Sequence, residues 1–179
     1  MKNTLLIAGC GDIALRAIPL LQSRYRIFGM YRSENTCEQL KMFNITALHG
    51  DLDAPKSLIK FAGVAQSILY LAPPPGQGTR DTRIAQFLSA ITRREILPQR
   101  LVYISTSGVY GNCDGAQIDE TQPIKPTSQR AIRRFDAEEQ IRRWGSRNQV
   151  NTSILRVPGI YAANRLPLTR LRAGHPALL

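Results

Sequence analysis

Short apolar runs alternate with stretches of helical spacing along most of this chain. The apolar runs predict strands at Thr4–Ala8, Arg26–Met30, Ile45–His49, Ser67–Ala72, Arg100–Ser105 and Asn151–Arg156. The stretches between them predict helices at Ile13–Ser23, Thr36–Phe43, Pro55–Phe61, Thr79–Arg94 and about Ser128–Trp144. Such alternation is typical of a parallel sheet with helices on both faces. We therefore predict an α/β fold, a doubly wound parallel sheet of about six strands.

A glycine-rich turn joins the first predicted strand to the first predicted helix. Gly9, Gly11 and Ala14 follow the spacing G-x-G-x-x-A, which seats a dinucleotide in Rossmann-type folds. Gly9 would allow the sharp turn, Gly11 would let the backbone approach a pyrophosphate, and Ala14 would keep the helix close to its strand. Asp12 and Ile13 begin the helix, whose N-terminal N–H groups would face the phosphates. A nucleotide-binding loop is therefore favoured over a plain strand–helix turn.

The end of the second predicted strand bears on the choice of cofactor. An NAD site usually has an acidic residue here for the ribose 2′-hydroxyl, whereas an NADP site has a basic residue near the 2′-phosphate. This chain has Arg32 and Ser33, a planar fork and a hydroxyl that could grip a phosphate. The alternative is an ordinary surface arginine. We expect NADP to be preferred over NAD.

Further cofactor contacts are expected where the third and fourth strands end. Asp51 and Leu52 follow the third strand, and the Asp51 carboxylate could accept a hydrogen bond from an adenine amino group. It could instead cap the helix that follows, because aspartate is a favoured N-cap residue. Ala72 and Pro73 lie at the end of the fourth strand, where a run of prolines fixes a rigid turn. Ligands of open α/β sheets lie at this carboxyl edge.

Length and composition limit the class of protein. A chain of 179 residues with 43% hydrophobic residues can fold as one domain with a substantial core. We see no apolar run near the ~20 residues of a membrane span and no signal-peptide pattern. Cys10, Cys37 and Cys113 lie far apart, so neither a disulfide framework nor a metal site is expected. These features predict a soluble, cytoplasmic protein.

The positive charge is unevenly distributed. Residues 1–124 carry 13 Lys/Arg against 10 Asp/Glu, a net +3, and residues 125–179 carry 11 against 3, a net +8. A basic region could bind nucleic acid, but these arginines lack interleaved aromatic residues and no binding motif is present. Nucleic acid is thus the weakest candidate partner, behind a phosphate-rich small ligand or an acidic segment outside this chain.

Several motifs in the second half resemble one enzyme family. The segment 101–111, Leu-Val-Tyr-Ile-Ser-Thr-Ser-Gly-Val-Tyr-Gly, resembles the fifth-strand signature of extended short-chain dehydrogenases/reductases, the NAD-dependent epimerase/dehydratase family. Asp119–Pro123, Pro126–Ser128, Ala137–Glu138 and Leu155–Tyr161 resemble the segments that follow, in the same order. The likeness extends from residue 4 to about residue 172. It implies a Rossmann fold and a dinucleotide cofactor.

The resemblance fails at the family's proton-transfer residues. The family uses a Ser or Thr, a Tyr, and a Lys four residues after the Tyr. Thr106 matches the hydroxyl position and would hydrogen-bond a substrate oxygen, unless it only satisfies its own backbone. The Tyr and Lys positions fall on Arg130 and Arg134, and arginine, with a pKa above about 12, cannot shuttle a proton. The resemblance is therefore to an atypical subgroup that lacks the usual tyrosine.

Residues 130–134 form an arginine-rich start to the last long helix. Arg130, Arg133 and Arg134 could clamp a phosphate or carboxylate of a substrate. The alternative, which we favour slightly, is a solvated helix face. The spacing from Arg134 to residue 138 and from residue 139 to residue 143 suits ion pairs across one helical turn.

Two functions follow from the resemblance. The first is a NAD(P)-dependent enzyme, preferring NADP, that acts on a carbonyl/alcohol or nucleotide-sugar-like substrate. The second is a catalytically silent dinucleotide-binding sensor or scaffold. The resemblance also divides the chain into a NAD(P)-binding domain, residues 1–165, and the start of a shortened C-terminal substrate lobe, residues 166–179.

Overall fold

Six parallel strands form a single sheet in the computed structural model, which describes residues 2–94, 96–164, 166 and 168–174. The strands are β1 (Asn3–Ala8), β2 (Tyr25–Tyr31), β3 (Thr46–His49), β4 (Ser67–Tyr70), β5 (Arg100–Thr106) and β6 (Asn151–Val157). Their order across the sheet is β3-β2-β1-β4-β5-β6, and every neighbouring pair is parallel. This is the Rossmann-type order, so the predicted fold is confirmed.

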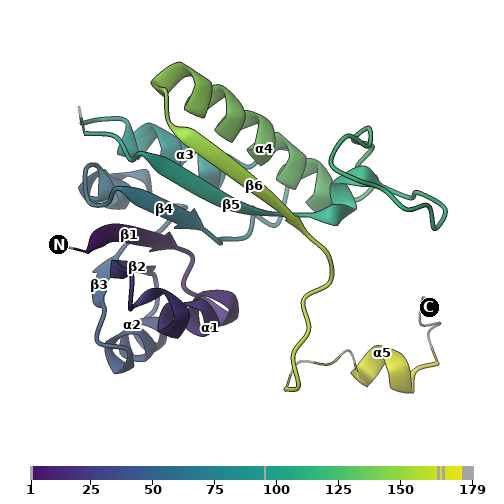
Figure 1. Cartoon of the computed structure of the whole chain (residues 1–179), viewed down its shortest axis with the longest axis horizontal. Coiled ribbons are helices and arrows are strands. Elements are labelled where there is room, and N and C mark those ends of the chain that lie inside the picture. The colour runs from purple at the N-terminus through teal and green to yellow at the C-terminus, as the bar shows by residue number, and fades with distance from the viewer. Residues whose placement is uncertain (1, 95, 165, 167, 175–179) are drawn as a thin grey trace.

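Helices cover both faces of the sheet (Figure 1). The elements that follow the strands are α1 (Asp12–Leu21), α2 (Glu34–Met42), the 3₁₀ helix η1 (Pro55–Phe61), α3 (Thr82–Ile91), the 3₁₀ helix η2 (Ser107–Tyr110), α4 (Gln129–Asn148) and α5 (Leu168–Arg172). One core cluster joins the sheet to α1 and α2, and the other joins it to η1, α3 and α4. The predicted helix at 55–61 is thus a 3₁₀ helix.

The central strand β1 shows why the sheet is buried on both sides. Leu5 and Ile7 belong to the core cluster under α1 and α2, whereas Leu6 and Ala8 belong to the cluster under α3 and α4. Successive side chains of a strand point to opposite faces, so an uninterrupted apolar run serves both layers. The apolar runs of the sequence predicted this strand within one residue of its observed bounds.

Strands β4 and β6 differ from this description of β1. Strand β4 ends at Tyr70, two residues before the predicted end, because the Leu71 and Ala72 amides both turn to donate to the Ala8 carbonyl. On the edge strand β6, exposed and half-buried residues alternate, and Leu155 is 48% exposed. Beyond β6 the chain leaves the sheet (Figure 1).

The described residues carry neither a membrane-spanning helix nor a cluster of metal ligands. None of the helices there has the length and apolar character needed to cross a bilayer. The same residues contain no group of three or more His, Cys, Asp or Glu side chains suited to a metal ion.

A buried ion pair fixes α4 to the edge strand. The Glu138 side chain is fully buried, and its Oε2 lies 2.8 Å from Nη2 of Arg156 on β6. Glu138 also accepts a hydrogen bond from Ser105, and Arg156 donates to the Tyr110 hydroxyl at 2.8 Å. Both charges therefore have close partners although little water reaches them.

Replacing Glu138 by Gln should lower the free energy of unfolding by about 3 kcal/mol, because Arg156, whose side chain is only 12% exposed, would lose its counter-charge. Chemical denaturation would measure this loss. The matched control is Glu139→Gln, whose side chain is exposed and which should cost less than about 1 kcal/mol. Equal losses in the two variants would contradict a structural role for the buried pair.

Candidate functional site

A cavity of about 930 Å³ runs along the carboxyl edge of the sheet. It is lined by segments that follow all the strands and by the first turns of α4. All the residues predicted from the sequence to contact a cofactor line it, except Ala14: they are Gly9, Gly11, Asp12, Ile13, Arg32, Ser33, Asp51, Leu52, Ala72 and Pro73. Thr106, Arg130 and Arg134 line the same cavity. The fold thus brings together candidate residues that are spread over more than a hundred positions of sequence.

The glycine turn after β1 has two glycines with different roles. Gly9 has φ +99°, and a Cβ there would lie 2.4 Å from the Ala72 backbone nitrogen, so the β1 turn can pack against β4 only without a side chain. A Cβ at Gly11 would meet no atom within 4 Å, which means that this position opens onto the cavity. Ala14 is fully buried in the core cluster under α1. It therefore holds the helix against the sheet.

Helix α1 begins directly at the cavity. Its N-cap residue is Gly11, and no side chain caps the helix there. The Asp12 carboxylate accepts a hydrogen bond from Arg16 at 3.0 Å, one turn further along the helix. Cys10, in the same loop, is a buried thiol whose pKa is raised to about 12 by desolvation. An uncapped helix N-terminus with a glycine at its entrance is suited to an anionic group such as a phosphate.

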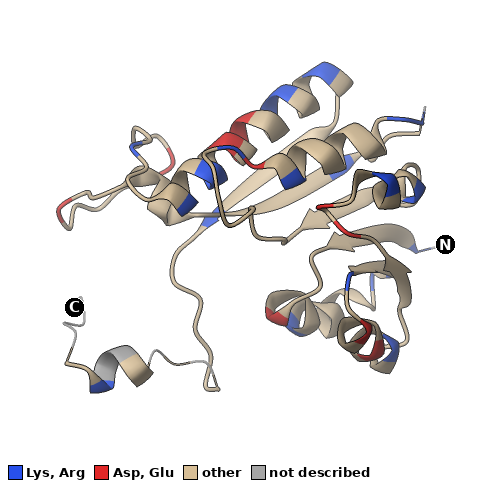
Figure 2. Cartoon of the chain, turned by 180° about the vertical axis from the view of Figure 1, so that it is seen from behind, with Lys and Arg blue, Asp and Glu red and all other residues tan. Residues whose placement is uncertain are grey.

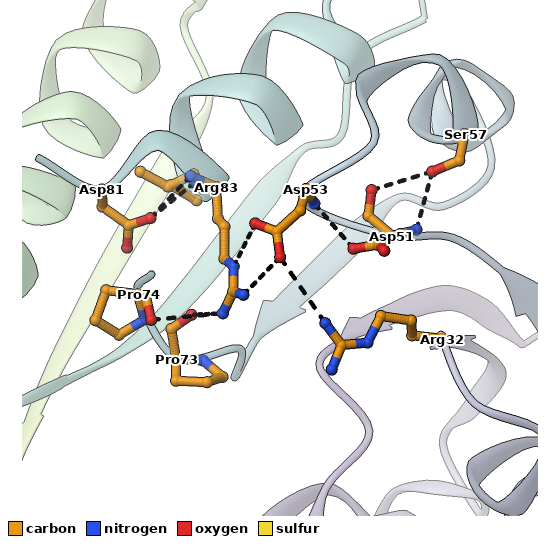
Figure 3. Close-up of polar contacts among 9 residues, drawn as sticks. Arg32, Asp51, Asp53, Ser57, Pro73, Pro74, Asp81 and Arg83 are labelled. Atoms are coloured by element: carbon orange, nitrogen blue, oxygen red, sulfur yellow. Dashed lines mark hydrogen bonds and ion pairs between the residues drawn. The ribbon is translucent and has the colours of Figure 1, made fainter. Parts of the chain in front are cut away.

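Three charged side chains meet beyond β2, β3 and β4 (Figure 3). Arg83, at the start of α3, donates from Nε and Nη2 to the two Asp53 carboxylate oxygens at 2.8 and 2.6 Å. Its Nη1 donates to the carbonyl oxygens of Pro73 and Pro74 at 3.3 and 3.5 Å. Arg83 lowers the pKa of the Asp53 carboxyl, because the ionised form accepts this bidentate contact. The pair ties the loop after β3 to the proline loop after β4.

Arg32 lies at the edge of this group. Its Nη1 is 3.8 Å from Oδ2 of Asp53, and its side chain is 67% exposed. The contact is long compared with the Arg83 contact to the same oxygen, at 2.6 Å. Most of the Asp53 charge is therefore balanced by Arg83, and the Arg32 guanidinium keeps an open side towards the cavity.

The roles of Asp53 and Arg83 were not predicted from the sequence. The two residues are 30 positions apart, one in the loop after β3 and the other in the first turn of α3, and no periodicity connects them. One signal was available: Arg83 is a cation in the first turn of α3, where the helix dipole disfavours positive charge. A positive charge at this position suggests a specific partner.

The side chains of Ser33 and Asp51 each accept a hydrogen bond from a backbone amide. The Ser33 hydroxyl accepts a hydrogen bond from the Thr36 amide at 3.4 Å and caps α2. The Asp51 Oδ1 atom accepts from the Asp53 amide at 2.9 Å. Asp51 does not cap η1, whose N-cap is Ala54 without a side-chain bond, so the capping alternative was wrong in this detail.

Hydroxyl groups and arginines gather at the β5 end of the cavity. Thr106 Oγ1 accepts a hydrogen bond from the Gly108 amide at 3.2 Å, as expected for a strand-end threonine bound to its own backbone. This bond uses the oxygen as acceptor, so the hydroxyl proton can still be donated to a ligand. Ser107 also lines the cavity, and Arg130 is exposed there.

The solvated face predicted for residues 130–134 is wrong for two of its arginines. Arg134 is only 6% exposed, and its Nη1 donates to Ile104 O at 2.8 Å, Tyr103 OH at 3.0 Å and Ala72 O at 3.3 Å. Arg133 is also buried and donates to a backbone carbonyl. Both side chains are therefore buried and bonded within the protein, not solvated.

The predicted ion pairs across one helical turn do not form as expected. Glu138 pairs with Arg156 and Arg142, and no described contact joins it to Arg134. The Arg143 Nε atom donates to the Glu139 carbonyl oxygen, not to its carboxylate. The spacing fixed which side chains share a helix face, but the packing of that face against β5 and β6 determined their partners.

Sequence and structure comparisons place this geometry among known proteins. The family model described as the NAD dependent epimerase/dehydratase family matches residues 17–173. No curated protein sequence shows a significant match. The structure is similar to the UDP-glucuronic acid 4-epimerase of Bacillus cereus solved with NAD, with 20% identity and a TM-score of 0.76 over 98% of this chain and 64% of that one.

A second solved structure is similar at higher sequence identity. It is a conserved protein of unknown function from Silicibacter pomeroyi, with 28% identity and a TM-score of 0.73 over 95% of this chain and 57% of that one. The chain thus spans less than two thirds of the length of either structure. The family match covers most of the chain, and the sheet order and the glycine turn agree with it. This protein belongs to the NAD dependent epimerase/dehydratase family.

Proposed function

We propose that the chain binds NADP(H), in preference to NAD(H), along the carboxyl edge of its sheet. The observation that carries the proposal is the glycine turn, where Gly11 opens onto the cavity at the uncapped start of α1. A pyrophosphate needs this combination of close backbone approach and helix N-terminus. The NAD in the Bacillus cereus epimerase supports a dinucleotide in this fold.

Successive groups of residues along the cavity suit successive parts of a dinucleotide. Gly9, Gly11, Asp12 and Ile13 would hold the pyrophosphate, with Ala14 supporting the turn from the core. Arg32 and Ser33 would hold the adenosine ribose and its 2′-phosphate, and Asp51 and Leu52 would flank the adenine. Ala72 and Pro73 would form the wall at β4. All but Ala14 line a single continuous cavity.

The charge balance around Arg32 supports the NADP preference. The Asp53 carboxylate, 3.8 Å from the Arg32 guanidinium, is already held by the bidentate contact from Arg83. A ribose with a free 2′-hydroxyl would find the Asp53 carboxylate already engaged, whereas a 2′-phosphate would find the open side of the Arg32 guanidinium.

When bound, the dinucleotide would supply hydride transfer to or from a carbonyl or alcohol carbon. Thr106 would donate its hydroxyl proton in a hydrogen bond to the substrate oxygen. Arg130 and Arg134 keep their protons, so a group other than these two would have to transfer the proton. A substrate with a carbonyl or alcohol, such as a nucleotide sugar, fits this scheme. Residues 166–179, of which 167 and 175–179 lie outside the described part of the chain, would begin a substrate lobe.

A second candidate function is a catalytically silent dinucleotide sensor or scaffold. It is favoured by the burial of Arg134, which holds backbone carbonyls in place and cannot act as a proton carrier. A panel of ketones, aldehydes and nucleotide sugars distinguishes the two functions. Turnover of any of them with bound NADPH would support the enzyme, and binding without turnover would support the sensor.

Replacing Gly11 by Val should weaken NADPH binding by about 10–100-fold, because the new side chain would fill the space that the pyrophosphate needs. Calorimetric titration would measure the change. The matched control is Gly76→Val, since a Cβ at Gly76 also meets no atom within 4 Å but the residue does not line the cavity. Tight NADPH binding by the Gly11 variant would contradict the proposed cradle.

Replacing Arg32 by Gln should remove the preference for NADPH over NADH. The expected loss in NADPH affinity is about 10-fold or more, from one charge-assisted contact, with NADH affinity little changed. Parallel titrations with both cofactors give the ratio directly. Arg26→Gln, an exposed arginine at the other end of β2, should leave the ratio as in the wild type. An unchanged ratio in the Arg32 variant would rule out its role.

A further inference from the structure

We propose that the β5 end of the cavity binds an anionic group of the substrate, a carboxylate or a phosphate, through Arg130 and Arg134. The inference rests on the proposed function, because the dinucleotide would occupy the part of the cavity nearer β1 and β2. Arg130 and Arg134 are one turn apart on α4, and both line the cavity. The pair would thus define the charge class of the substrate.

Arg134 is a buried cation without an ion pair. The side chain is 6% exposed, and within the described chain it has no carboxylate oxygen within 4.0 Å. Its three hydrogen bonds all come from Nη1 and go to neutral acceptors. Nε and Nη2 donate to none of the described residues. A buried charge is costly without a counter-charge, so this guanidinium favours an anion beside it.

No nearby carboxylate of the described residues forms an ion pair with Arg134. Glu138 is held by Arg156, Ser105 and Arg142. Asp81 interacts with Arg134 only at longer range, and burial raises the pKa of its carboxyl although Arg134 acts to lower it. Neither Glu138 nor Asp81 therefore neutralises the Arg134 guanidinium by direct contact. The positive charge of Arg134 therefore remains available to a ligand.

Arg130 adds a second cation at the same end. It is exposed, lines the cavity, and has no hydrogen bond or ion pair with the described part of the chain. The cavity's own acidic residues, Asp12 and Asp51, follow β1 and β3, and β4 lies between β1 and β5 in the sheet. Strands are about 4.8 Å apart, so the β5 end is about 10 Å from the β1 turn. The acidic side chains that line the cavity therefore lie away from Arg130 and Arg134.

Hydroxyl groups complete the proposed anion site. Thr106, Ser107 and Ser128 line the cavity near the start of α4. The Ser128 and Thr106 oxygens accept backbone hydrogen bonds, which leaves their protons as donors. Two guanidinium groups and several hydroxyl donors form a set that matches carboxylate or phosphate oxygens. At positions where a tyrosine and a lysine would move a proton, this chain would bind charge.

The test is calorimetric titration of the full chain, saturated with NADPH, with succinate, inorganic phosphate and the neutral succinamide. At least one anion should bind and succinamide should not. The tighter anion would identify the chemical group, carboxylate or phosphate. Arg130→Gln should weaken that binding by about 10-fold, because one charge-assisted contact is lost.

The matched control is Arg147→Gln, an exposed arginine at the other end of α4, which should change anion affinity by less than about two-fold. Figure 2 shows basic residues towards both ends of α4 with acidic residues between them, so the two variants remove equal charge at opposite ends. Equal weakening in both variants would mean general attraction to a basic protein and would overturn the proposal, as would the absence of anion binding.

Failure of the proposed function is separately visible. If the wild-type chain binds neither NADPH nor NADH, the dinucleotide proposal fails by itself. The same anion titrations on the chain without NADPH, with Arg130→Gln and Arg147→Gln compared, would then still decide the anion site. Selective weakening in the Arg130 variant supports the site, and equal or no weakening overturns it.

Discussion

The close approach of Gly9 to the Ala72 backbone is the constraint on which the site depends. A Cβ at Gly9 would lie 2.4 Å from the Ala72 nitrogen, so the turn after β1 packs against the end of β4 only because this residue has no side chain. The same contact brings the start of α1 to the point where the strand order reverses. Ligands of doubly wound sheets bind at that point. The position of the cavity thus follows from one steric requirement.

Charge is distributed along the cavity by a small number of specific contacts. Arg83 engages Asp53, which leaves Arg32 open beyond β2, and Arg156 engages Glu138, which leaves Arg134 without an ion pair beyond β5. In each place one arginine balances the local carboxylate, and a second arginine faces the cavity. This arrangement connects the proposed phosphate selectivity at one end with the proposed anion site at the other.

Much of the fold could be predicted from the sequence, because apolar runs report directly on burial. The alternation at β1 between two core clusters is an example. The glycine turn was also predictable, since its spacing encodes local backbone geometry. The Asp53–Arg83 pair was not, because its partners come from a loop and a helix start that only the folded sheet brings together. The burial of Arg134 was missed for a related reason: helical spacing groups side chains on a face but does not say what covers that face.

Hydrogen exchange of the wild-type chain with and without NADPH tests the central claim most directly. If NADPH lies in the proposed cradle, amides of residues 9–14 and 32–34 should exchange more slowly on binding, with weaker protection from NADH at residues 32–34. Residues 32–34 lie at the start of α2, where the Ser33 side chain caps the helix. Greater protection of these amides by NADPH than by NADH would point to a contact with the 2′-phosphate. Binding of NADPH without protection of residues 9–14, or no binding to the folded chain, would contradict the account.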